Sequence, residues 1–205
     1  MSTLDILFGR MRDSGLPFEK ATKEKAEAGT DPNAWMTPLQ TAQAIAKLVA
    51  PAKFESALLH IREEYAAGTN GGTGLVNVWN TRTLNTLRTN EIGASLASNV
   101  ITLSAGTYFS EGSAPAYNSG SHQIRLWNIT DNLTALNGSS ESNSSSNVQT
   151  RSFLSGRFTI ASAKQFRLEH YITVNSGSSS AFGLSTNAVN AGPAIFSDLK
   201  IWKVA

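Results

Sequence analysis

A change of periodicity near residue 54 constrains the fold of this 205-residue chain more than any other feature. Beyond it, apolar and polar side chains alternate with a period of two, which is typical of strands with one buried face. The longest such run has one face made of Val148, Thr150, Ser152, Leu154, Gly156, Phe158 and Ile160. Because no helical repeat separates these runs, the sequence predicts an antiparallel sandwich or barrel over residues 54–205, which we interpret as a jelly roll.

We expect roughly eight to ten strands in this part of the chain. The clearest runs cover 57–62, 76–84, 100–103, 107–114, 123–129, 148–160, 166–174 and 195–204. Turn residues separate them at 68–74, 105–106, 118–120, 137–138 and 175–177. Segments 138–147 and 175–180 consist of small polar residues apart from one glutamate, and are therefore predicted to be exposed loops.

Residues 1–53 are predicted to form short helices and to serve as an attachment and connector region. Leu4, Leu7, Phe8 and Met11 follow the spacing of one helical face. A weaker helix is expected over 18–28, and a third over 38–49, after the capping sequence Thr37-Pro38-Leu39-Gln40. Helices shorter than about 12–15 residues are marginal alone in water, so we expect these to pack on copies of themselves or on another protein.

Composition excludes several classes of function. Only 16% of the residues are charged and the net charge is +2, so no nucleic-acid partner is expected. The chain has no cysteine, which rules out disulfides, thiolate metal sites and cysteine nucleophiles. No apolar stretch reaches the roughly 20 residues that span a bilayer, so neither membrane insertion nor a classical export signal is expected.

Residues for catalysis are also scarce. His60, His122 and His170 all fall within expected strands, where we interpret them as hydrogen-bonded structural residues. Glu63 and Glu64 form the one adjacent carboxylate pair that we considered for glycoside hydrolysis, but neighbours on a strand point to opposite faces. The sequence therefore predicts no enzyme, and it indicates no cofactor or metal site.

Two groups of residues could mediate binding, and each has a structural alternative. Trp79, Tyr117 and Trp127 lie near polar turns and could stack on sugar rings, although tryptophans in a sandwich more often belong to its core or an interface. The helix with Leu4, Leu7, Phe8 and Met11 could fold back onto the sandwich. We favour a docking role in a groove of a larger assembly, because residues 15–31 are charged and separate it from the strands.

Residues 20–31 and 35–45 resemble a module of tail fibre proteins from tailed bacteriophages. The similarity rests on Ala28-Gly29-Thr30-Asp31 and Met36-Thr37-Pro38, while Lys25-Ala26 departs slightly from the usual pattern. In that family the module lies between the virion-attachment end and the distal fibre. The resemblance thus implies that residues 1–53 connect a virion to residues 54–205.

A second resemblance covers about residues 57–205. Ala105-Gly106-Thr107-Tyr108, the segment 122–128 and the closing segment 198–203 look like a domain common at the carboxyl ends of phage fibre proteins. That domain is similar to the trimeric jelly rolls of the tumour necrosis factor and complement globular-head group. The resemblance implies a homotrimer that displays its loops distally, and it transfers no catalytic residue.

These observations predict a short tail fibre, made in the host cytoplasm and located on the virion tail. Leu4, Leu7, Phe8 and Met11 would dock on a tail or baseplate protein. A host cell-surface glycan or protein would be contacted by Tyr117, Asn118, Ser119, Asn143, Ser176 and Ser178. The alternatives are a capsid decoration or head-spike protein and a glycan-cleaving tailspike.

Overall fold

The computed structural model describes residues 57–143, 147–175, 179–186 and 191–204, and before them 19–20, 22–28, 34–35 and the single positions 37, 39, 41 and 45. The chain divides into two compact units according to its internal contacts, Met1–Glu55 and Ser56–Ala205.

In the first unit, strands β1 (Glu19–Lys20) and β2 (Ala34–Trp35) pair in parallel. Helix α2 (Lys23–Ala28) falls within the expected segment 18–28. Near the start of the expected helix 38–49, the Thr41 N–H donates to the Thr37 carbonyl at 2.9 Å. The docking helix with Leu4, Leu7, Phe8 and Met11 lies outside the described residues, as does most of segment 38–49. No helix in the described part of the chain is long and apolar enough to cross a bilayer.

The described residues of the second unit form eleven strands, and every pairing between these strands is antiparallel. They are β3 (Ala57–Tyr65), β4 (Trp79–Thr81), β5 (Thr86–Asn90), β6 (Ser95–Ala97), β7 (Val100–Leu103), β8 (Gly106–Tyr117), β9 (Gly120–Asn128), β10 (Leu133–Asn143), β11 (Gln149–Ile160), β12 (Lys164–Ile172) and β13 (Ala194–Lys203).

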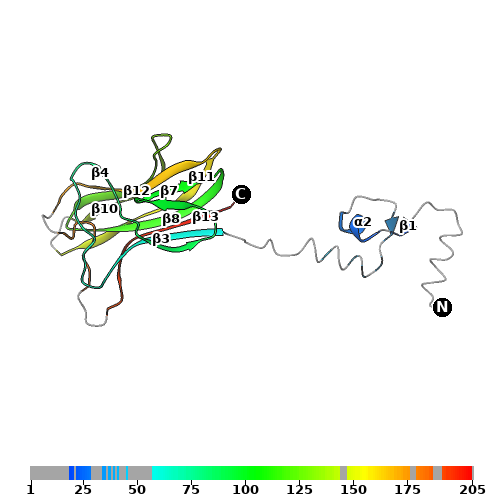
Figure 1. The fold of residues 1–205 in the computed structure, drawn as a ribbon, viewed down its shortest axis with the longest axis horizontal. Helices are drawn as coiled ribbons and strands as arrows, with labels where there is room; N and C mark the ends of the chain where they lie inside the picture. The colour runs from blue at the N-terminus through cyan, green and yellow to red at the C-terminus, as the bar shows by residue number, and fades with distance from the viewer. Residues whose placement is uncertain are drawn as a thin grey trace. The chain divides into compact units, whose positions relative to one another are not determined.

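The strands form two layers that are joined into one curled sheet (Figure 1). Sheet I has the order β5-β3-β13-β8-β11, and sheet II has the order β10-β9-β12-β7-β6, with β4 paired to β12. The layers connect where Gly138 of β10 faces Leu154 of β11. The mainly antiparallel β prediction is confirmed, and the arrangement is consistent with a jelly-roll sandwich.

The core lies between the two sheets and follows the predicted alternation. Sheet I contributes Leu59, Ile61, Leu154, Leu199 and Ile201, and sheet II contributes Ile101, Ile124, Leu126, Phe166 and Leu168. Along β11, Ser152, Leu154 and Ile160 are buried while Phe153 and Ser155 are exposed. The period-two pattern thus identified the buried face of the longest strand correctly.

Strand β10 corrects two predictions. It runs through the expected turn at 137–138 and through 138–143 of the expected loop 138–147. Strand pairing uses backbone hydrogen bonds, so serine and asparagine can occupy a strand that lacks an apolar face. Gly138 allows close packing rather than a turn here, since a Cβ atom would lie 2.7 Å from Cγ1 of Ile124.

The expected strand 76–84 is shorter in the structure, where β4 covers Trp79–Thr81. Asn77 has a left-handed backbone with φ of 60°, and the Asn80 side chain both accepts from the Leu75 N–H and donates to its carbonyl. These contacts hold residues 75–78 as a turn. The sequence did not indicate strands β5 and β6, because short edge strands with few apolar residues give little periodic signal.

Candidate functional site

Several loops of the second unit, among them the β8–β9 connection and the loop around Phe182, lie at the end opposite to the start of β3 (Figure 1). There the Tyr117 hydroxyl donates to Oδ1 of Asn147 at 2.7 Å, and the Asn118 N–H donates to the Val148 carbonyl at 3.2 Å. Both predicted contact residues are half-buried. The structure thus brings Tyr117 and Asn118 to the same end of the unit.

Ser119 and Asn143 also lie at this end, but they are buried, so the prediction that they contact a host surface is wrong. Asn143 accepts from the Ser119 N–H at 2.7 Å and donates to the Ala116 carbonyl at 2.6 Å. The Ser119 hydroxyl points to the Ala181 carbonyl at 2.9 Å. Their polar groups are satisfied inside the chain and fix the loops. Ser176 and Ser178 lie outside the described residues.

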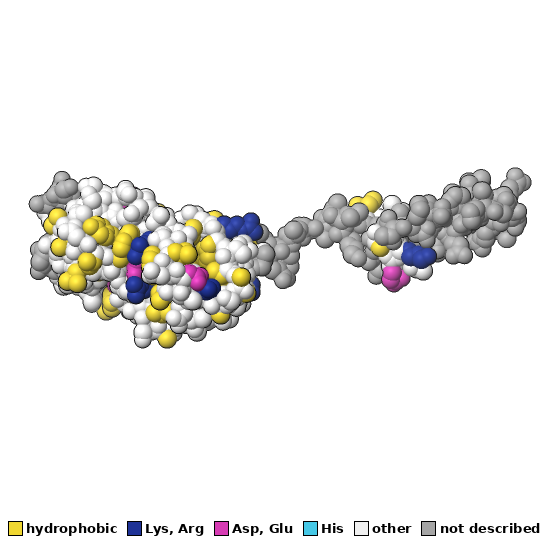
Figure 2. All heavy atoms as spheres, turned by 90° about the horizontal axis from the view of Figure 1, so that it is seen from above, with side chains coloured by type: hydrophobic (Ala, Val, Ile, Leu, Met, Phe, Trp, Pro, Cys, Tyr) yellow, Lys and Arg dark blue, Asp and Glu magenta, His cyan; other side chains and the backbone are white. Residues whose placement is uncertain are grey.

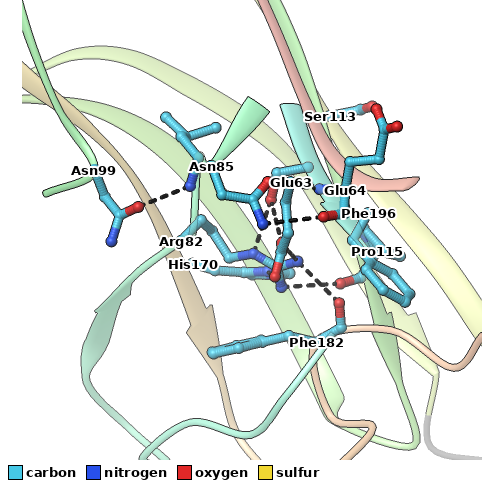
Figure 3. Close-up of polar contacts among 12 residues, drawn as sticks. Glu63, Glu64, Arg82, Asn85, Asn99, Ser113, Pro115, His170, Phe182 and Phe196 are labelled. Atoms are coloured by element: carbon cyan, nitrogen blue, oxygen red, sulfur yellow. Dashed lines mark hydrogen bonds and ion pairs between the residues drawn. The ribbon is translucent and has the colours of Figure 1, made fainter. Parts of the chain in front are cut away.

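A buried ion pair lies beneath these loops (Figure 3). Arg82 Nη2 contacts Oε2 of Glu63 at 2.5 Å and also donates to the Phe182 carbonyl at 2.9 Å. Its Nε donates to the Ser197 hydroxyl at 2.9 Å, and its guanidinium carbon lies 4.5 Å from the centroid of the Phe182 ring. Arg82 and Glu63 are each at most 1% exposed. Paired and hydrogen-bonded in this way, the two charges hold β3 and the loop around Phe182 together.

A chain of two histidines continues from this pair toward the surface. Arg82 Nη1 can only donate, so Nδ1 of His170, 3.4 Å away, accepts. Nε2–H of His170 then donates to Nδ1 of His122 at 2.9 Å, and Nε2–H of His122 donates to the Thr150 hydroxyl at 2.7 Å. A second proton on either ring would set two N–H groups against each other, so the geometry requires both rings to be neutral.

The pKa values of both rings are shifted downward, which also favours the neutral form. Burial lowers the pKa of His122 to about 4, with Glu141 opposing the shift and Arg82 adding to it. Burial also holds the pKa of His170 well below its ordinary value, and the electrostatic effects of Arg82 and His122 lower it further. The pair is therefore built for the neutral state.

The remaining candidate catalytic residues have structural partners as well. His60 Nε2 lies 3.1 Å from Oδ1 of Asp198. Glu63 faces the core, whereas Glu64 is on the other side of β3 and accepts from Arg88 at 2.6 Å. The two carboxylates of the adjacent pair thus point apart. In the described residues, no three His, Asp or Glu side chains are arranged to hold a metal ion.

The outward face of sheet I is the first candidate binding surface. At one end Leu58, Trp202 and Phe109 lie side by side on β3, β13 and β8, with the last two rings 5.9 Å apart. Toward the other end, Phe153 is 58% exposed and Ile195 is 38% exposed. These apolar groups lie at either end of a polar strip.

The polar strip of sheet I contains paired and unpaired charges. Arg62 donates to Asp198 at 2.8 Å, while Lys200 and Glu111 face each other across β13 and β8 without an ion pair to any described residue. An open groove of about 600 Å³ runs over this region, lined by Glu111, Ser113, Arg151, Phe153, Ile195 and Lys200 among others. The face combines apolar patches with charges that lack partners.

The outward face of sheet II carries the second candidate surface. The guanidinium of Arg125 lies between two indole rings, 4.1 Å from the ring centroid of Trp79 and 3.9 Å from that of Trp127. Glu169 accepts from Arg125 at 2.6 Å and from Arg167 at 2.6 Å. Figure 2 shows one side of this unit, where apolar side chains lie beside intermixed basic and acidic ones.

Sequence reasoning singled out Trp79 and Trp127 but missed the charged residues between them. The signal was present: Arg125 and Trp127 are two residues apart on one expected strand, as are Arg167 and Glu169 on another, so each pair shares a face. What the pattern did not reveal was that β9 and β12 are neighbours with Arg125 opposite Glu169.

Comparison with known proteins gives matches among solved structures. No protein-family model matches the chain, and no curated protein sequence does. The chain is similar to the globular domain of the zebrafish complement 1qA protein, with a TM-score of 0.46 and 12% identity over 74% of this chain and 98% of that one. It is also similar to murine APRIL, with a TM-score of 0.43 and 10% identity over 73% of this chain and 100% of that one. Both are distant likenesses of fold.

Proposed function

We propose that this protein is a short tail fibre of a tailed bacteriophage. In this proposal it assembles as a homotrimer through the outward face of sheet I, attaches to a tail or baseplate protein through residues 1–53, and contacts a host cell-surface glycan or protein through the second unit. It acts by binding rather than by catalysis.

The observation that carries the proposal is the composition of the sheet I face. Exposed apolar side chains on a sheet are typical of an interaction surface. Leu58, Trp202 and Phe109 at one end and Phe153 at the other would be removed from water by contact with other copies. Glu111 and Lys200 carry opposite charges and have no ion-pair partner among the described residues, so they suit pairing with charges on a neighbouring copy.

A trimer would also suit weak attachment to a cell. Each loop cluster around Tyr117 and Asn118 would be present three times on one particle, and repeated contacts raise avidity without a deep pocket. The attachment end rests on the fibre-like sequence at residues 20–31 and 35–45.

Two measurements test the proposal. Analytical ultracentrifugation of the full chain should give three times the 21.9 kDa chain mass, and a folded monomer at micromolar concentration would contradict the assembly. Electron microscopy of virions labelled with an antibody to the second unit should show the label on the tail. Label on the head would favour the capsid decoration alternative, and release of reducing ends from host polysaccharide would favour the tailspike.

A further inference from the structure

We propose that the outward face of sheet II is a binding site for an acidic glycan, in which Trp79 and Trp127 support the sugar rings and Arg167 binds a carboxylate. This inference deepens the proposed function, on which it rests, by naming the face that meets the host and the class of ligand. It assigns contact to a sheet face in addition to the loops around Tyr117.

The aromatic part of this site is held in place before any ligand arrives. Arg125 packs against one face of each indole, at 4.1 Å from the Trp79 ring centroid and 3.9 Å from the Trp127 centroid. Tyr171 packs beside Trp79 with ring centroids 5.5 Å apart. Both indoles are half-buried, so each retains exposed area. Rigid aromatic side chains that are partly exposed bind at a low entropic cost.

The charged part of the site has an excess of one positive charge. Glu169 is fully buried although it belongs to the outward face, because Arg125 and Arg167 both bind its carboxylate, at 2.6 Å each. Within the described ranges, neither guanidinium contacts a second carboxylate. Arg125 is enclosed by the indoles, whereas the Arg167 side chain is 36% exposed. The excess charge is therefore available at Arg167.

Arg167 and Trp127 lie directly opposite each other on β12 and β9. A pyranose ring stacked on the Trp127 indole would thus bring a carboxylate substituent next to the Arg167 guanidinium. The planar fork of donors on arginine matches a carboxylate and forms charge-assisted hydrogen bonds with it. Uronic and sialic acids offer both a ring with an apolar face and a carboxylate, so they fit this pair of side chains.

The location of the site agrees with the proposed assembly. The trimer contacts proposed above use the outward face of sheet I, and the outward face of sheet II lies on the other side of the core. Self-association would therefore leave Trp79, Trp127 and Arg167 accessible in each copy.

The test uses the full chain and immobilised polysaccharides of known composition. The acidic probes are polygalacturonate, alginate, hyaluronate and polysialic acid, and the neutral probes are dextran and mannan. We expect binding to at least one acidic probe, a change of intrinsic tryptophan fluorescence on binding, and weak or no binding to the neutral ones. Arg167→Gln should weaken the binding at least tenfold, while Arg167→Lys, which keeps the charge without the fork, should be intermediate.

Arg88→Gln is the matched control. Arg88 is a comparably exposed arginine that is paired with Glu64 on sheet I, so its replacement removes the same charge at another site and should leave glycan binding unchanged. Circular dichroism and sedimentation of each variant establish that fold and assembly are preserved.

Three outcomes would overturn the inference: no binding to any acidic probe, equal binding by Arg167→Gln and wild type, or equal binding to acidic and neutral probes. Binding to host cells that is removed by protease but survives periodate would instead identify a protein partner. Neither the position of the antibody label on the virion nor the mass of the assembly in sedimentation depends on sheet II. Failure of the glycan inference is therefore distinguishable from failure of the tail fibre proposal.

Discussion

The neutral histidine pair beneath the loops predicts that this protein loses stability in mild acid. Burial lowers the pKa of His122 from its ordinary value of 6.5 to about 4. Because the folded state disfavours the charged ring, its contribution is fully present above pH 6.5 and is lost as the pH falls toward 4. At 1.36 kcal/mol per pKa unit, His122 alone lowers the free energy of unfolding by about 2 kcal/mol between pH 7 and pH 5. His170 adds a loss of the same sign.

The measurement is urea denaturation at pH 7, 6 and 5, followed by tryptophan fluorescence. His122→Gln is the informative variant, because glutamine can still accept from His170 and donate to Thr150 but does not titrate. Between pH 7 and pH 5, the free energy of unfolding of this variant should decrease by about 2 kcal/mol less than that of the wild type. Equal stability of the wild type at pH 7 and pH 5, or an unchanged slope in the variant, would refute the tautomer assignment and its energetic consequence.

Three further predictions concern packing and assembly. Arg82→Met should lower the free energy of unfolding by about 3–5 kcal/mol, because it leaves the buried carboxylate of Glu63 unpaired. Urea denaturation would detect this loss, and a change below about 1 kcal/mol would contradict the prediction. Gly138→Ala should cost about 1–3 kcal/mol through the close contact described above, whereas Gly192→Ala, which meets no atom within 4 Å, should be nearly neutral in the same assay. Phe153→Ser should weaken the proposed trimer in sedimentation without unfolding the chain, and Leu133→Ser, similarly exposed on sheet II, should leave that assembly unchanged.

The sequence predicted the antiparallel sheet well where a strand alternates regularly, as β9 does. Strand β7 matches the expected range 100–103, and the buried residues of β11 are those that the period-two pattern selected. Strand β10 was not predicted from the sequence. Its pairing depends on backbone groups and on a glycine at a crowded position, and neither of these produces apolar periodicity.

Prediction of the candidate sites was less complete for a related reason. Small polar residues were assigned to the surface, yet Asn143 uses its amide to bind two backbone groups in the interior. Burial of an amide depends on which backbone groups face it, and that is set by tertiary structure. The stacking of Arg125 between Trp79 and Trp127 likewise requires knowledge of which strands are neighbours.

The first residue of β3 and the last residue of β13 lie opposite each other, since Ala57 pairs with Lys203. The entry and exit of this unit are therefore adjacent, and the loop cluster is at the far end. A fluorescent protein or affinity handle fused after β13 should emerge beside the start of β3 and leave the loops around Tyr117 unobstructed. The same geometry would allow the whole unit to be exchanged as a cassette, with different loops carried on an unchanged point of attachment.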